Sequence, residues 1–151
     1  MAEYSAPATL SSPGPDISFN PNPLSFPTGY HDPDMCSGLE KLGQVRAVTE
    51  DRPRTDGGII YPRLLAPRQF VLGGTVLTGG GGVAAREGWL EDLADVLDAL
   101  RAGGGTYVWV GAGGTYTVSG VFFDGSFQAP GKYLKKYQFA LVADPPTVVI
   151  T

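Results

Sequence analysis

The residue types that could do chemistry gather at a few places in the chain. His31, Asp32, Asp34 and Cys36 lie close together and include types that bind metal ions. Cys36 and His31 also form a conceivable nucleophile and base. However, His31 is the only histidine and Cys36 the only cysteine, whereas a catalytic zinc needs three protein ligands with an orienting shell. We therefore expect no metal site and no catalytic pair here.

A second candidate is a glycine-rich segment before a predicted helix. Gly79, Gly81 and Ala84 match the G-x-G-x-x-A pattern that binds dinucleotides. The acidic residue that should follow about 20 positions later would be Asp98, in the middle of the helix, and no further strand–helix–strand unit follows. We expect a turn and no cofactor, with a small nucleotide-binding enzyme kept as a lesser alternative.

A third candidate is a small group of lysines and tyrosines near the C-terminal end. Lys132, Lys135 and Lys136 stand beside Tyr133 and Tyr137, a mixture that can meet phosphates and bases. Three lysines are few, and the net charge of the chain is −4, so a solvated strand edge is the expected role. We expect no sequence-specific nucleic-acid contact.

Motifs of common enzymes and membrane segments are missing from the sequence. It contains no G-x-S-x-G, no H-E-x-x-H and no Walker loop, so we expect a protein that is not an enzyme. No apolar run approaches the ~20 residues of a membrane-spanning helix, and we expect no membrane partner.

Proline marks the N-terminal part as different from the rest. Seven prolines fall between residues 7 and 33, and each biases the preceding residue away from helix. We predict an extended arm over residues 1–42, with a disordered tail as the alternative. Its large apolar side chains suggest docking on a neighbouring subunit. The candidate inter-subunit contacts are Ile17, Phe19, Leu24, Phe26 and Tyr30.

Residues 83–102 predict the one strong helix of the chain. Apolar side chains recur there at spacings of three and four, while acidic residues take the opposite side. The stripe must cover a sheet. The candidate helix–sheet core consists of Trp89, Leu93, Val96, Leu97 and Leu100.

The segments around this helix read as strands and glycine turns. Residues 43–50 alternate as a half-buried strand, Asp56-Gly57 signals a turn, and residues 68–78 form a strand whose Gly73-Gly74 pair indicates a bulge or a close backbone approach. A hairpin is expected about residues 112–114, followed by a closing strand within 133–145 and a last short strand or tail. The predicted fold class is α+β, mainly β: residues 43–151 form an antiparallel β-sandwich flanked by one α-helix.

The order of these motifs resembles the distal tail and minor tail proteins of bacteriophages with long, non-contractile tails. The resemblance spans residues 43–146: a strand led by Arg68 follows Asp56-Gly57, a helix comes next, and the segment closes with an F-x-L-x-A-D-P element. That element consists of Phe139, Leu141, Ala143, Asp144 and Pro145. In that family the β-sandwich and helix close into a six-membered ring at the end of the tail.

The resemblance implies a structural virion protein of the tail tip. Such a protein, a hexamer assembled in the host cytoplasm, joins the tail tube to tail-tip or baseplate hub proteins around the DNA channel. The implied partners are further copies of itself, the tail tube protein, the hub proteins and the tape-measure protein. A tail tube or tail-completion subunit is the main alternative.

Overall fold

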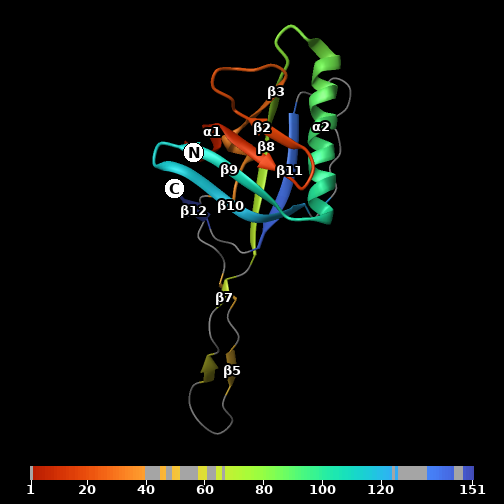
Figure 1. Ribbon diagram of the computed structural model, residues 1–151. Coiled ribbons are helices and arrows are strands. Elements are labelled where there is room, and N and C mark those ends of the chain that lie inside the picture. The colour runs from red at the N-terminus through yellow and green to blue at the C-terminus, as the bar shows by residue number, and fades with distance from the viewer. Residues whose placement is uncertain are drawn as a thin grey trace.

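The computed structural model describes residues 2–39, 45–46, 49–51, 58–60, 64–65, 67–123, 125, 136–144 and 148–151 (Figure 1). The elements run in this order: α1 (Ala2–Ser5), β1 (Ala8–Ser11), β2 (Asp16–Phe19), β3 (Thr28–His31), the 3-10 helix η1 (Pro33–Met35), β4 (Val45–Arg46), β5 (Thr49–Asp51), β6 (Gly58–Ile60), β7 (Leu64–Leu65), β8 (Arg68–Leu77), α2 (Gly82–Ala102), β9 (Gly105–Gly111), β10 (Gly114–Phe123), β11 (Lys136–Ala143) and β12 (Val148–Ile150). The described part is thus mainly β, with one long helix, as the sequence predicts.

The N-terminal strands belong to the main sheet. β1 pairs antiparallel with both β2 and β9, and β3 pairs antiparallel with β8. Burial alternates along β1 and β2, so every second side chain enters the core. The expected division into an arm over residues 1–42 and a domain over 43–151 is therefore corrected, because β1 is an interior strand between β2 and β9.

The side chain of Asn20 links these first strands by hydrogen bonds. Its side-chain amide donates hydrogen bonds to the carbonyl oxygens of Tyr4, at 2.7 Å, and Ala6, at 3.0 Å. Its side-chain oxygen accepts a hydrogen bond from the backbone N–H of His31 at 2.9 Å. The residue adopts a left-handed conformation with φ of 48°, which asparagine tolerates better than most residues. One buried side chain thus links the segments around β1, β2 and β3.

The sheet closes on itself. Its strand order is β11-β8-β3-β2-β1-β9-β10-β12, and β10 also pairs with β11, so seven strands form a closed barrel. A register shift between Ser119 and Val121 bends the long strand β10, which pairs with β12 along its first half and with β11 at its end. The predicted antiparallel β-sandwich is corrected to a single closed sheet. It is also mixed, because β2 and β3 pair in parallel at Phe19 and Gly29.

Two short ladders stand apart from the barrel. β4 pairs antiparallel with β7, and β5 with β6. Figure 1 shows them extending away from the barrel as one narrow projection. β4 and β5 fall within or beside the strand predicted over residues 43–50, whereas the predicted turn at Asp56-Gly57 lies outside the described residues.

Helix α2 covers the barrel and completes the core. It contacts β10, β2, β3 and β8 along its length, and Figure 1 shows it running beside the sheet. Its apolar stripe merges with the inner faces of the strands into one continuous cluster. The structure buries every residue of the candidate helix–sheet core: Trp89, Leu93, Val96, Leu97 and Leu100.

The glycine pair in β8 marks a close approach of strands. Gly74 pairs with His31 on one side and Tyr137 on the other. A Cβ on Gly74 would overlap the carbonyl oxygen of Tyr30, so only glycine fits without a backbone shift. Of the two predicted explanations, close approach is the one observed. The predicted hairpin is confirmed as well: β9 and β10 pair antiparallel from Gly111 and Gly114 onward.

Candidate functional site

A buried polar centre lies inside the barrel. The imidazole of His31 lies between two tyrosine hydroxyls: Nδ1 is 2.9 Å from the Tyr137 hydroxyl oxygen, and Nε2 is 3.0 Å from that of Tyr107. Phe19 stacks on the imidazole, with ring centroids 4.4 Å apart. Because a neutral imidazole has one donor and one acceptor nitrogen, one hydroxyl donates to the ring and the other accepts from it. The centre therefore links β3, β9 and β11.

Burial keeps this centre uncharged. Desolvation lowers the pKa of His31 from 6.5 to about 3, because the charged imidazolium loses its water. Desolvation likewise raises the pKa of Tyr107 and of Tyr137 well above 10, and the neighbouring Cys36 adds to the rise. None of the three groups titrates near pH 7. Their chemistry is hydrogen bonding between strands.

The residues that the sequence offers as metal ligands form hydrogen bonds with other groups of the protein. The Cys36 thiol donates to the carbonyl oxygen of Gly73 at 3.2 Å and accepts from its N–H at 3.3 Å. Asp32 caps η1 by accepting from the N–H of Asp34 at 3.0 Å, and His31 is held by the two tyrosines. Among the residues that the structure describes, no three His, Cys, Asp or Glu side chains gather closely enough to hold a metal ion.

The glycine-rich motif forms the turn between β8 and α2. Gly79 has φ of +59°, and the N–H of Gly81 donates to the carbonyl oxygen of Thr78 at 3.0 Å. In a dinucleotide-binding fold the strands before and after such a helix are parallel members of one βαβ unit. Here β8 lies between β11 and β3, both antiparallel to it, and β9 pairs with β1 and β10. The geometry fits a turn.

The predicted lysine–tyrosine patch divides between two environments. Lys136 is exposed on β11, whereas Tyr137 points into the core beside His31. Lys132, Tyr133 and Lys135 lie outside the described residues. A strand alternates its faces, so neighbours in sequence cannot both reach one surface.

The candidate inter-subunit contacts also fall into separate groups. Ile17 and Phe19 are buried in the core of their own chain. The prediction that they contact a neighbouring subunit is therefore corrected, because a side chain buried in its own core is not available to a neighbour. Tyr30 is half-buried. Leu24 and Phe26, in the loop between β2 and β3, are exposed. Only this loop keeps the predicted role as a surface for contact.

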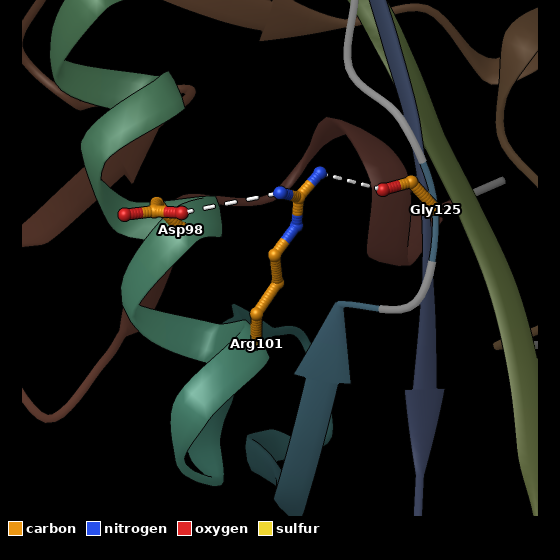
Figure 2. Close-up of polar contacts among 3 residues, drawn as sticks. All are labelled: Asp98, Arg101 and Gly125. Carbon is orange, nitrogen blue, oxygen red and sulfur yellow. Dashed lines mark hydrogen bonds and ion pairs between the residues drawn. The ribbon is translucent and has the colours of Figure 1, made fainter.

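The outer face of α2 is acidic. Its exposed carboxylates belong to Glu87, Glu91, Asp92, Asp95 and Asp98. Figure 2 shows Arg101, on the last turn, reaching Asp98 at 4.0 Å and donating to the carbonyl oxygen of Gly125 at 2.8 Å. Its guanidinium also lies 5.3 Å from the centre of the Phe123 ring. Exposed pairs of this kind contribute little to stability. Arg101 thus connects the end of α2 with Phe123 at the end of β10 and with Gly125. None of the helices in the described part of the chain is long and apolar enough to cross a membrane.

Large apolar side chains are exposed at several further places. We define the end-loop patch as Leu24, Phe26, Leu77 and Val83. Val110, Val149 and Ile150 are exposed as well, but they do not form one surface, because the pairing of β12 with β10 turns the neighbours Val149 and Ile150 to opposite faces of the sheet. Sequence reasoning identified the first two residues of the end-loop patch and missed the rest. Leu77 carried a detectable signal, because it follows the buried Val76 directly and so takes the outward phase of the strand.

Comparison with solved structures finds the same fold in a phage protein. The Dit protein of SPP1, described as a paradigm of the hub adsorption apparatus of phages that infect Gram-positive hosts, matches 95% of this chain with a TM-score of 0.60 and 15% sequence identity. The chain spans about half of that structure, 52% of its length. The resemblance to distal tail proteins noted from the sequence is thus confirmed at the level of the fold.

A second match is weaker in shape. The sheath–tube complex of an extracellular contractile injection system, PVC, in its extended state contains a chain with 17% identity and a TM-score of 0.43, over 95% of this chain and 87% of that one. No protein-family model matches the sequence, and no characterised protein matches it by sequence.

Proposed function

We propose that this protein is a structural component of the phage tail tip. It forms a ring that joins the tail tube on one side to tail-tip or baseplate hub proteins on the other, around the channel through which DNA passes. The observation that carries the proposal is the shared fold with SPP1 Dit over nearly the whole chain. The order of sequence motifs is independent support, because it points to the same kind of protein without coordinates.

The surface is compatible with such a role. A ring subunit must offer two different faces, one to each neighbour, so that contacts are heterologous and the rotation between copies closes the ring. Exposed apolar side chains lie both in the loop between β2 and β3 and on β12, which are different elements. By family resemblance we propose six copies, with the tail tube, hub and tape-measure proteins as further partners. The protein is then a virion component, assembled in the host cytoplasm, without catalytic activity and without sequence-specific contacts to DNA.

Mass photometry of the purified protein at several concentrations tests this function. We expect a species of about 95 kDa, six times the 15.9 kDa subunit. Where the free protein is monomeric, tail tube and hub proteins are added. Negative-stain images of the assembled species should show a closed ring with a central channel. Long stacks would instead favour a tail tube or tail-completion subunit, and a strict monomer under every condition would contradict the ring.

A further inference from the structure

We propose that the barrel opens as two rigid halves along the seam between β2 and β3. The small half consists of β3, β8 and β11, and the large half consists of β1, β2, β9, β10 and β12. During the opening β10 and β11 stay paired and act as the hinge. This inference concerns a movement within one subunit. It goes beyond the proposed ring and does not depend on it.

Each half is held together by extended antiparallel ladders. In the small half, β8 pairs with the whole of β11 and with the whole of β3. In the large half, β1 pairs along its whole length with β2 and with β9, and β9 pairs along its whole length with β10. Separating such ladders requires unfolding of much of the domain, so each half should move as one unit.

The seam between β2 and β3 is much weaker than these ladders. The two strands pair in parallel at Phe19 and Gly29 alone. One further backbone hydrogen bond crosses the seam, from the N–H of Asn20 to the carbonyl oxygen of Gly29 at 3.2 Å. Side chains make additional contacts across it: the Asn20 side-chain oxygen accepts from the N–H of His31 at 2.9 Å, and Phe19 stacks on the imidazole. The two halves are thus joined here mainly by side chains and not by a ladder.

The core beneath the seam is polar. His31 and Tyr137 belong to the small half and Tyr107 to the large half, so the hydrogen bond between His31 and Tyr107 crosses from one half to the other. When an opening admits water, these groups exchange hydrogen bonds within the protein for hydrogen bonds to water. The entry of water therefore costs less at this centre than it would in a core of purely apolar side chains.

The second seam has the features of a hinge. β10 pairs with β11 over Val121–Phe123, and the N–H of Asp144 donates to the carbonyl oxygen of Gly120 at 3.1 Å. Gly120 lies at the register shift of β10, where the strand changes its partner from β12 to β11, and has φ of +65°. Glycine tolerates this conformation best, and a hinge is a small number of residues whose backbone absorbs a rotation. β10 can therefore bend at Gly120 while the ladder beyond it stays paired.

Helix α2 is attached more firmly to the large half. Arg101, near its C-terminal end, contacts the Phe123 ring of β10. Leu100 lies against Gly105 of β9. The N-terminal end of α2 is joined to β8 of the small half by the four glycines of residues 79–82, and two of these glycines have positive φ. Glycine-rich segments are flexible links, so α2 can move away from β8 without unfolding.

Trp89 of α2 covers the seam in the closed barrel. A Cβ on Gly29 would overlap its indole, and its ring centroid lies 5.2 Å from that of Tyr137, so it contacts the small half. Its edge contact with Phe19 lies within the large half. The projection formed by β4–β7 lies between η1 and β8 in the chain, so both of its ends join the small half. The opening therefore also turns the projection relative to α2.

Native-state hydrogen exchange, followed by NMR at several urea concentrations below the unfolding transition, tests the inference in the wild-type chain. The N–H groups of Asn20 and His31 are the reporters, because their hydrogen bonds cross the seam. The ladder amides of β8 and β9 are the controls within the two halves. The N–H of Val142 is the control at the hinge, because bonded pairs alternate along a ladder and the bond from Asp144 to Gly120 makes Phe122 and Val142 the next bonded pair.

We expect Asn20 and His31 to exchange through one common opening, at least ~100-fold faster than the controls. Their exchange should also depend less on urea than that of the controls, because the opening exposes less surface than global unfolding. The amide of Val142 should exchange with the controls, since the hinge stays paired.

Gly80→Ala and Gly88→Ala form a matched pair of variants. An added Cβ meets no atom within 4 Å at either position, and neither residue has a positive φ, so both variants should fold. Gly80 lies in the glycine link, whereas Gly88 lies within α2. A stiffer link should slow the exchange of Asn20 and His31 by about two- to fivefold. Gly88→Ala should leave that exchange unchanged, because α2 is helical in both the closed and the open barrel.

Three results would overturn the inference. Exchange of Asn20 and His31 only together with the ladder amides of β8 and β9 would show that the seam does not open separately. Exchange of Val142 together with the reporters would show that β10 and β11 separate and are no hinge. Equal effects of the two alanine variants would contradict the movement of α2 away from β8. The ring is judged separately, by mass photometry, and each of these results leaves it unaffected.

Discussion

The buried histidine predicts a specific acid sensitivity of folding. In the folded protein the pKa of His31 lies at about 3, because burial penalises the charged ring. In the unfolded chain the ring is solvated and its pKa returns to about 6.5. Below pH 6.5 the imidazole of His31 binds a proton in the unfolded chain but stays neutral in the folded chain. The contribution of His31 to the free energy of unfolding is therefore fully present above about pH 6.5. It decreases as the pH falls below this value and levels off near pH 3.

The size of the effect follows from these two pKa values. Between pH 7.5 and pH 4.5 the unfolded chain gains about 2.6 kcal/mol relative to the folded chain from this one group. The slope approaches about 1.4 kcal/mol per pH unit. Domains are stable by only about 5–15 kcal/mol, so the loss is a large share of the total.

Urea unfolding followed by tryptophan fluorescence at several pH values measures this dependence. His31→Gln removes the titrating ring, while the glutamine amide can still form a hydrogen bond with one tyrosine hydroxyl. We therefore expect a lower free energy of unfolding that depends much less on pH. Tyr137→Phe removes one hydrogen-bond partner of His31 and keeps the imidazole. We expect this variant to have a lower free energy of unfolding with the same pH dependence as the wild type. The exposed carboxylates are common to all three proteins and cancel in the comparison. Equal slopes in the wild type and His31→Gln would refute the reasoning.

Three further predictions concern packing and chain integrity. Leu93→Ala, in the core, should cost about 2–5 kcal/mol, whereas Asp95→Ala, on the exposed face of α2, should cost little; equal losses on denaturant titration would contradict the orientation of the helix. Gly74→Ala should cost several kcal/mol because of the backbone overlap, whereas Gly80→Ala meets no atom within 4 Å and should change the melting temperature little. Removal of residues 1–19 deletes β1 and β2 and should abolish cooperative unfolding by circular dichroism, so a truncated chain that folds normally would argue against the barrel.

Local patterns were sufficient to predict part of the fold. The helix over residues 83–102 matches α2 because its apolar stripe is long and regular. The β9–β10 hairpin was predictable because β-branched and aromatic runs flank a short glycine turn. The close approach at Gly74 was detectable because glycine inside a strand usually has a spatial cause.

The sequence does not reveal the N-terminal strands, because the density of prolines there indicates an extended arm. Most of those prolines stand between the strands, where they cost no ladder hydrogen bond. Alternation was present in two four-residue segments, 8–11 and 16–19, too short to outweigh the composition. The contacts of His31 with Tyr107 and Tyr137 could not be predicted from local sequence patterns. Its two tyrosines lie 76 and 106 residues from His31 in sequence, and only the closure of the sheet brings them together.

The place of β1 in the sheet fixes when the protein can fold during its synthesis. Ala8 pairs with Trp109, and the barrel closes only when Ala143 meets Val121. The pair of β1 and β2 therefore leaves the ribosome long before β9 exists, and until then β1 has an unpaired edge that other chains could join. Pairings so distant in sequence also make closure slow. The barrel can close only after the chain has been made as far as Ala143, so a chain that is terminated before this residue lacks a strand of the closed sheet.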